Sequence, residues 1–187
     1  MSATGSQDMG SAMAEAVLGI YAPAGRLNMT WYESIDQLPD INDYDIIKGK
    51  RTYRYFDGKV LYPFGYGLSY TNFQYSDITL SAPTMGQDGS VTAMVTVTNT
   101  GKYDGAEVVQ LYIRDLVGSI TRPVKELKGF DKIFLKAGES KTVSFKITPE
   151  LLRFYDYELN FVAEPGDFDI MIGGSSQSVK TAHLSLK

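Results

Sequence analysis

The chain has 187 residues, of which 43% are hydrophobic and 21% charged, and this fits one well-cored globular domain with a smaller segment attached. Its 22 acidic and 18 basic side chains leave a net charge of −4, which argues against nucleic acid or an anionic membrane as a partner. The absence of cysteine excludes disulfides and thiolate sites, and no apolar run is long enough to cross a bilayer.

The N-terminal part predicts one short helix followed by an extended connector. Apolar residues recur there at helical spacing, at Met9, Met13, Val17 and Leu18. Gly19 suits the position just after a helix. From residue 21 to 45, prolines and a glycine divide the chain into turns around a short strand at residues 27–32. Residues 1–10 lack the features of a signal peptide. We therefore expect a soluble chain whose compartment, cytoplasmic, periplasmic or secreted, the sequence leaves open, with any signal upstream.

From about residue 73 the sequence takes on the pattern of β-strands. Apolar and polar residues alternate with period two, so that each strand turns one face to a core and the other to solvent. The runs lie at residues 75–80, 91–97, 109–113, 127–135, 143–147, 168–172 and 182–186. Turn-forming residues separate them, and Pro149 begins one helical turn. The fold class is therefore all-β: a sandwich of about seven strands, immunoglobulin-like or fibronectin type III-like, preceded by the helix and connector.

Three groups of motifs resemble family 3 glycoside hydrolases. The stretch LYPFGYGLSYT at residues 61–71 resembles the signature that joins the second and third domains of that family. The stretch APAGRL at residues 22–27 is similar to an element near the end of the family's α/β domain, with Ala22 and Asn28 replacing the usual Asn and Pro. Residues 95–112 and 125–130 resemble the family's fibronectin type III-like domain.

This resemblance implies three segments. Residues 1–50 would be the remnant of an α/β sandwich domain, residues 51–72 an aromatic-rich linker, and residues 73–187 the fibronectin type III-like domain. The family consists of exo-acting enzymes that retain configuration, and retention needs two carboxyl groups about 5 Å apart. In the family the nucleophile and the acid/base precede residue 1, so the resemblance places no catalytic residue in this chain. We expect the chain to be inactive alone and to have the missing N-terminal catalytic domains as its partner.

The sugar remains open between β-xylosides and β-glucosides of plant type. Motifs between residues 31 and 56 resemble the β-xylosidase-like branch of the family more than the β-glucosidase branch. The alternative, from a different class, is a stand-alone carbohydrate-binding or protein-interaction module that uses the sandwich alone. Oligosaccharide is the expected partner of a carbohydrate-binding module, and of the accessory part only where it borders the sugar cleft.

Aromatic and arginine side chains concentrate in the linker. Rings stack on the apolar face of a pyranose while a guanidinium donates to its hydroxyls, so this composition suits sugar recognition. The opposing interpretation is that the same side chains attach the connector to the sandwich, and we favour it for residues 62–70. For the start of the linker the two stand about even. The candidate substrate-binding residues are Arg51, Tyr53, Arg54 and Tyr55.

The remaining polar residues are weaker candidates for a functional site. Carboxylates pair at residues 43 and 45, 156 and 158, and 167 and 169, and we interpret these pairs as solvated faces. The single histidine, His183, should point outward near the C-terminus, and one imidazole makes no metal site. The sequence contains no cofactor fingerprint, so we predict no cofactor and no metal.

The N-terminal segment has too little apolar surface to fold independently. We therefore expect its helix and Trp31 to pack against the sandwich or against another copy of the chain, which would make the segment a site of self-association.

Overall fold

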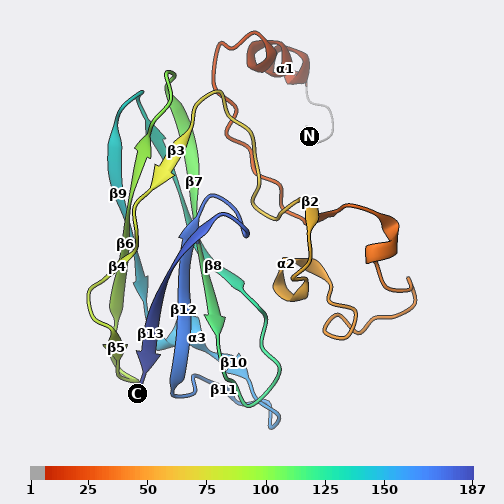
Figure 1. Ribbon diagram of the computed structural model, residues 1–187, viewed down its shortest axis with the longest axis vertical. Helices are drawn as coiled ribbons and strands as arrows, with labels where there is room; N and C mark the ends of the chain where they lie inside the picture. Colours follow the sequence, from red (N-terminus) through yellow and green to blue (C-terminus); the bar gives the residue numbers. More distant parts are fainter. Residues whose placement is uncertain (1–6) are drawn as a thin grey trace.

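The computed structural model describes residues 7–187; residues 1–6, the start of the predicted N-terminal segment, lie outside the described part. An elongated β-sandwich forms the larger body, and a connector runs along its side and ends in a separate loop region (Figure 1). This arrangement confirms the predicted sandwich with its preceding helix and connector.

The first sheet is built around one central strand. It contains β3 (Phe73–Tyr75), β4 (Thr79–Leu80), β6 (Val91–Asn99) and β9 (Ser140–Ile147). β6 pairs antiparallel with each of the other three. Its valines at positions 91, 95 and 97 are buried, whereas the threonines between them lie on the outer face. The alternation in the sequence therefore sets which face of this sheet meets the core.

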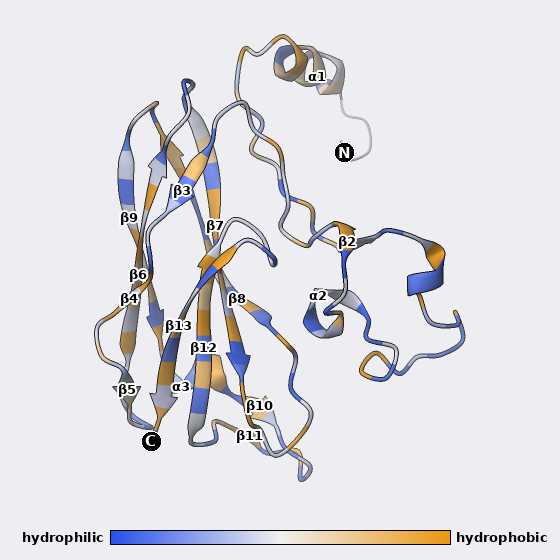
Figure 2. Cartoon of the chain, viewed as in Figure 1, coloured by the Kyte–Doolittle hydropathy of each residue, from blue (hydrophilic) through white to orange (hydrophobic). Residues whose placement is uncertain are grey.

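The second sheet has five strands in the order β5–β13–β12–β7–β8. Their bounds are β5 (Thr84–Met85), β7 (Gly105–Asp115), β8 (Glu126–Leu135), β12 (Gly166–Gly173) and β13 (Val179–Leu186). The core between the sheets is apolar, and its largest fully buried side chains include Phe168, Leu111, Ile133 and Ile170. In Figure 2 hydrophobic and hydrophilic residues alternate along the strands of both sheets.

Short elements complete the fold. They are α1 (Met9–Val17), β1 (Trp31–Tyr32), the 3₁₀ helix η1 (Ile35–Gln37), α2 (Thr52–Tyr55), β2 (Val60–Tyr62), α3 (Pro149–Leu152), β10 (Phe154–Tyr155) and β11 (Phe161–Val162). β1 pairs with β2 and β10 pairs with β11. Pro149 stands at the start of α3, as the sequence predicts.

Several details differ from the sequence prediction. The strand expected at residues 75–80 is divided into β3 and β4, which pair with different parts of β6. The strand expected at residues 27–32 is limited to β1. β5 pairs parallel with β13, where the sequence suggested an antiparallel sandwich. Two-residue strands show no period of their own, so only their pairing defines them.

The expected packing of the N-terminal helix onto the sandwich is wrong. None of the described residues of α1 is buried, and Val17 is 78% exposed. The helix stands away from the sandwich, at the end of the molecule opposite the C-terminus (Figure 1). Two tyrosine hydroxyls hold it, from Tyr21 to the carbonyl of Ala12 and from Tyr70 to the carbonyl of Ala16. Packing against another copy stays a prediction.

Trp31 also avoids the sandwich. It lies in β1, opposite Tyr62 of β2, and remains 37% exposed. The connector therefore forms a small two-stranded unit of its own beside the sandwich.

Candidate functional site

The connector enters one end of the sandwich through a buried ion pair. The guanidinium of Arg26 contacts the carboxylate of Glu107 on β7, and their side chains are only 12% and 6% exposed. The hydroxyl of Tyr75 on β3 donates to the other oxygen of the same carboxylate at 2.8 Å. Burial raises the pKa of Glu107, and the charge of Arg26 opposes that rise. The three side chains join the connector to both sheets.

The aromatic signature lies against the outer face of the second sheet. Leu27 exchanges two backbone hydrogen bonds, each 2.8 Å long, with Gly65 and Tyr66. The amide of Gln110 on β7 donates to the carbonyls of Gly65, at 3.2 Å, and of Gly174, at 2.7 Å. Gly65 has a φ of +81°, and a Cβ there would meet the side chain of Gln110. Its backbone therefore requires glycine.

An aromatic stack continues this contact. The ring of Phe64 stacks on that of Tyr53 with centroids 4.2 Å apart, and both meet Tyr112 edge-on. Tyr112 is fully buried although it points to the outer face of β7, because the connector covers it. Phe64 therefore attaches the connector to the sandwich, as one of the two interpretations of the signature expects. Tyr62 and Tyr70, in contrast, remain substantially exposed.

The four predicted substrate-binding residues lie on one short segment but do not converge on one surface. Arg51 donates to the carbonyls of Asp40, at 3.0 Å, and of Asp43, at 2.6 Å, within its own loop. Arg54 pairs with Glu126 of β8 at 2.7 Å. Tyr53 accepts a hydrogen bond from the backbone of Leu127, at 3.2 Å. Tyr55 is half-buried. Tyr53 and Arg54 thus attach the linker to β8.

The backbone around Arg51 is strained. Its neighbours Lys50 and Thr52 both have positive φ, 46° and 63°, and for the β-branched threonine this conformation is costly. The backbone N–H of Thr52 donates to the hydroxyl of Tyr32, at 2.8 Å, which holds the segment in place.

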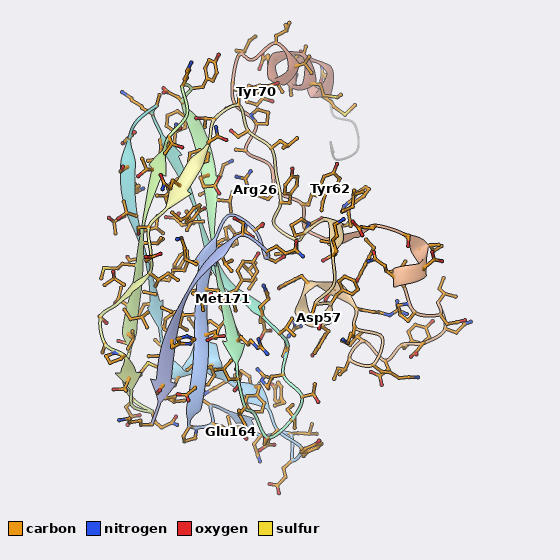
Figure 3. The ribbon with its side chains drawn as sticks, viewed as in Figure 1. Arg26, Asp57, Tyr62, Tyr70, Glu164 and Met171 are labelled. Atoms are coloured by element: carbon orange, nitrogen blue, oxygen red, sulfur yellow. The ribbon has the colours of Figure 1, made fainter. Side chains whose placement is uncertain are left out.

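A cavity of ≈ 400 Å³ separates this linker from the second sheet. Tyr53, alone among the four candidates, lines it. Figure 3 labels one residue from each wall: Asp57 on the connector and Met171 on β12. Apolar groups form part of both walls, namely Phe56, Val60, Pro63, Val124 and Met171.

Charged side chains line the same cavity. Lys125 is half-buried and donates to the carbonyl of Ser176 at 2.5 Å. Burial lowers the pKa of Lys125, and repulsion from Arg114 lowers it further. Arg114 stands at the end of β7 on its outer face. Neither cation stands out in the sequence, because each lies at a strand end or in a loop and only the fold brings it to the linker.

The acidic pairs form local contacts. Asp43 and Asp156 accept backbone hydrogen bonds in turns, and these bonds hold the pKa of each carboxyl below its usual value. Asp167 accepts from Ser185 across the β12–β13 pair. His183 is exposed, as predicted, with its Nδ1 2.6 Å from Asp169.

Within residues 7–187 no three His, Asp or Glu side chains are grouped to hold a metal ion. No helix in the same range has the length and apolar character needed to cross a membrane.

Two family models match the chain. The Glycosyl hydrolase family 3 C-terminal domain matches residues 1–70, and the fibronectin type III-like domain matches residues 107–176. The chain is 50% identical over 187 residues to a periplasmic beta-glucosidase of Salmonella typhimurium, covering 95% of this chain and 24% of that protein. It is 47% identical over 174 residues to a putative beta-xylosidase of Formosa agariphila, covering 93% and 23%.

Solved structures give the same result. A β-glucosidase from Erythrobacter marinus superposes with a TM-score of 0.83 at 37% identity, over 95% of this chain and 24% of that one. A β-D-glucoside glucohydrolase from Trichoderma reesei has a TM-score of 0.83 at 32% identity, over 97% and 29%. The chain therefore spans about a quarter of the length of the relatives it matches.

Proposed function

Because the chain belongs to family 3 of the glycoside hydrolases and corresponds to the C-terminal part of such an enzyme, we propose that it is the accessory part of a retaining exo-β-glycosidase. The sandwich supports the catalytic domains, which supply the nucleophile and the acid/base. One observation carries this proposal: the buried contact of Arg26 with Glu107 fixes the connector to the sandwich. Because the connector is held firmly, the sandwich keeps a fixed position relative to the α/β domain to which the connector belongs.

The substrate is a β-glucoside or a β-xyloside, since relatives of both names match the chain at similar identity. The purified chain should not hydrolyse aryl β-glucosides or aryl β-xylosides above a mock preparation. Hydrolysis by the chain alone would contradict the proposal.

A complementation experiment tests the accessory role directly. The Salmonella relative is truncated by the quarter that this chain matches, and the remainder is co-expressed with this chain. We expect aryl β-glucosidase activity to return when the chain is present. A matched Arg26→Met chain should restore less activity, since it loses the contact that fixes the connector. Failure of the unaltered chain, shown to be folded, would count against the role.

The alternative of a stand-alone carbohydrate-binding or protein-interaction module makes a different prediction. Such a module should bind xylo-oligosaccharides or cello-oligosaccharides saturably in calorimetry, whereas an accessory support should not.

The segment of Arg51, Tyr53, Arg54 and Tyr55 borders the sugar cleft in this proposal. The strained backbone at Lys50 and Thr52 supports this placement of the segment, because strained backbone conformations concentrate at functional sites. In the complemented enzyme, Tyr55→Ala should raise KM about five- to tenfold, as expected for a lost ring–sugar contact of roughly 1 kcal/mol. Tyr157→Ala, an exposed tyrosine on the distant β10–β11 turn, is the control. Unchanged KM in Tyr55→Ala would remove Tyr55 from the cleft.

A further inference from the structure

The cavity between the linker and the second sheet combines apolar walls with polar groups. The wall formed by the connector and the linker, called the connector wall, includes the ring of Phe56. The wall formed by the second sheet includes Met171. Its volume lies in the range of small-molecule pockets, about 300–1,000 Å³. Apolar faces joined to a few convergent polar groups are the usual composition of such a pocket.

The charges of the cavity are unequally compensated. Asp57 lies 3.4 Å from the ammonium of Lys50; Asp169 lies 2.6 Å from His183 and stands opposite Arg114 in the β7–β12 register, without forming an ion pair with it. Arg114 and Lys125, in contrast, form no ion pair within residues 7–187. The two cations repel each other, which is part of the reason that the pKa of Lys125 is lowered. A negative group placed between them would relieve this repulsion and accept charge-assisted hydrogen bonds.

Hydrogen-bonding capacity is also unused. The hydroxyl of Thr30, in the connector wall, is buried and has no hydrogen-bond partner. A buried hydroxyl without a partner is uncommon in a folded protein. Lys125 uses one acceptor, the carbonyl of Ser176, although an ammonium has three donors. The carboxylates of Asp57 and Asp169 add acceptors at the same cavity.

We propose that this cavity binds a sugar acid, a monosaccharide with a carboxylate. The carboxylate lies between Arg114 and Lys125, and the sugar hydroxyls meet Thr30 and the two aspartates. The apolar face of the ring lies against Phe56 and Met171, as pyranose rings do on apolar side chains. Such a ligand contacts both walls, so it strengthens the attachment of the linker to the sandwich. This site goes beyond the accessory role, because it concerns a ligand of the isolated chain.

Calorimetry on the complete 187-residue chain tests the proposal with three probes: D-glucuronate, D-glucose and acetate. We expect saturable binding of D-glucuronate, with Kd at least about tenfold lower than for either other probe, since carboxylate and hydroxyls contribute separately. Equal affinity for acetate would reduce the site to a simple anion site and overturn the proposal. No saturable binding of D-glucuronate, or equal affinity for D-glucose, would overturn it as well.

Two substitutions locate the binding site. Arg114→Met should raise the Kd for D-glucuronate about tenfold, and it should not affect folding because the side chain of Arg114 is exposed and makes no hydrogen bond within residues 7–187. Thr30→Val keeps the shape of the side chain and should weaken D-glucuronate severalfold without changing acetate. Arg153→Met, an arginine on the distant α3 turn, is the matched control. Unchanged D-glucuronate affinity in Arg114→Met would place the ligand elsewhere and contradict the proposal.

Hydrolysis is not measured in these experiments, so their failure leaves the accessory role untouched. Failure of the complementation experiment would likewise leave the sugar-acid site standing.

Discussion

Arg26 and Glu107 place two opposite charges at one end of the apolar core. Both side chains are largely removed from solvent, so each charge is compensated mainly by the other, and Glu107 also accepts a hydrogen bond from the hydroxyl of Tyr75. Breaking a buried pair by removing one partner costs about 3–5 kcal/mol, because the remaining charge stays buried without compensation. This pair is therefore the single contact between connector and sandwich that is most sensitive to substitution.

Arg26→Met should lower the free energy of unfolding by about 3 kcal/mol at pH 7, and the loss should shrink as the pH falls. Burial already raises the pKa of Glu107, and removing the arginine raises it further. Because the folded-state pKa of Glu107 is raised, its contribution to the free energy of unfolding is fully present below the unfolded-state pKa, about 4.3. This contribution is lost as the pH rises through the folded-state pKa.

Urea unfolding of wild type and variant from pH 4 to 7 measures this difference. Lys180→Met removes the exposed pair with Asp77 and should cost no more than about 1 kcal/mol at any of these pH values. A deficit for Arg26→Met that stays constant from pH 4 to 7 would show that Glu107 does not titrate as described.

Gly67 allows the signature to approach the connector closely. A Cβ on Gly67 would lie 2.2 Å from the carbonyl oxygen of Gly25, a backbone atom that moves only with the chain. Gly67→Ala should therefore destabilise the protein by about 1–3 kcal/mol, as overpacking does. Gly25→Ala, which meets no atom within 4 Å, is the matched control and should change the midpoint of urea unfolding little. Equal midpoints for the two variants would argue against a rigid contact.

At the scale of elements, strands with a long alternating pattern were predictable and short ones were not. β6, β7, β9, β12 and β13 each carry enough alternation to define a buried face. Alternation does not name a partner, however, and so the parallel pairing of β5 with β13 was not foreseen. α1 was predictable from its period, but its exposure was not, since an apolar stripe does not reveal what covers it.

Hydrogen exchange should separate the elements. Amides around Val95 in β6 and Leu111 in β7 should exchange only by global unfolding, because both strands are paired on both sides and face the core. Amides near Phe145 should also be protected where β9 pairs with β6, and α1 should exchange much faster because none of its described residues is buried. Equal protection of α1 and β6 at high dilution would mean that the helix belongs to one cooperative fold.

At the scale of the whole molecule, the two outer faces of the sandwich differ. Hydroxyl side chains cover the first sheet, with Thr96 bonded to Thr142 and Thr98 to Ser140 across the strands. The outer face of the second sheet carries the connector, the cavity and Tyr112. The aromatic and arginine composition of the linker marks it in the sequence as a candidate site, whereas the opposite wall of the cavity with Arg114 and Lys125 could not be predicted, since it is formed by tertiary packing.

The exposed apolar side chains around α1 belong to this scale, and we propose that they mediate self-association. Val17, Leu18 and Ile20 are all more than two thirds exposed, which is unusual for a group of neighbouring aliphatic residues. Sedimentation velocity should show dimers that increase with concentration, and Val17→Asp with Leu18→Asp should remain monomeric. Val117→Asp, equally exposed in a distant loop, is the control. A wild-type chain that is monomeric at all concentrations would rule out this role.

Trp31 gives the molecule a local optical signal. It is the only tryptophan in the chain and lies in β1, in the connector, away from the sandwich core. Its emission therefore reports on the connector, while far-ultraviolet circular dichroism reports on the many strands of the sandwich. Coincident curves from the two signals would mark one two-state transition, and separated curves would mark release of the connector before the sandwich unfolds. The protein thus carries its own spectroscopic label for the junction between its two parts.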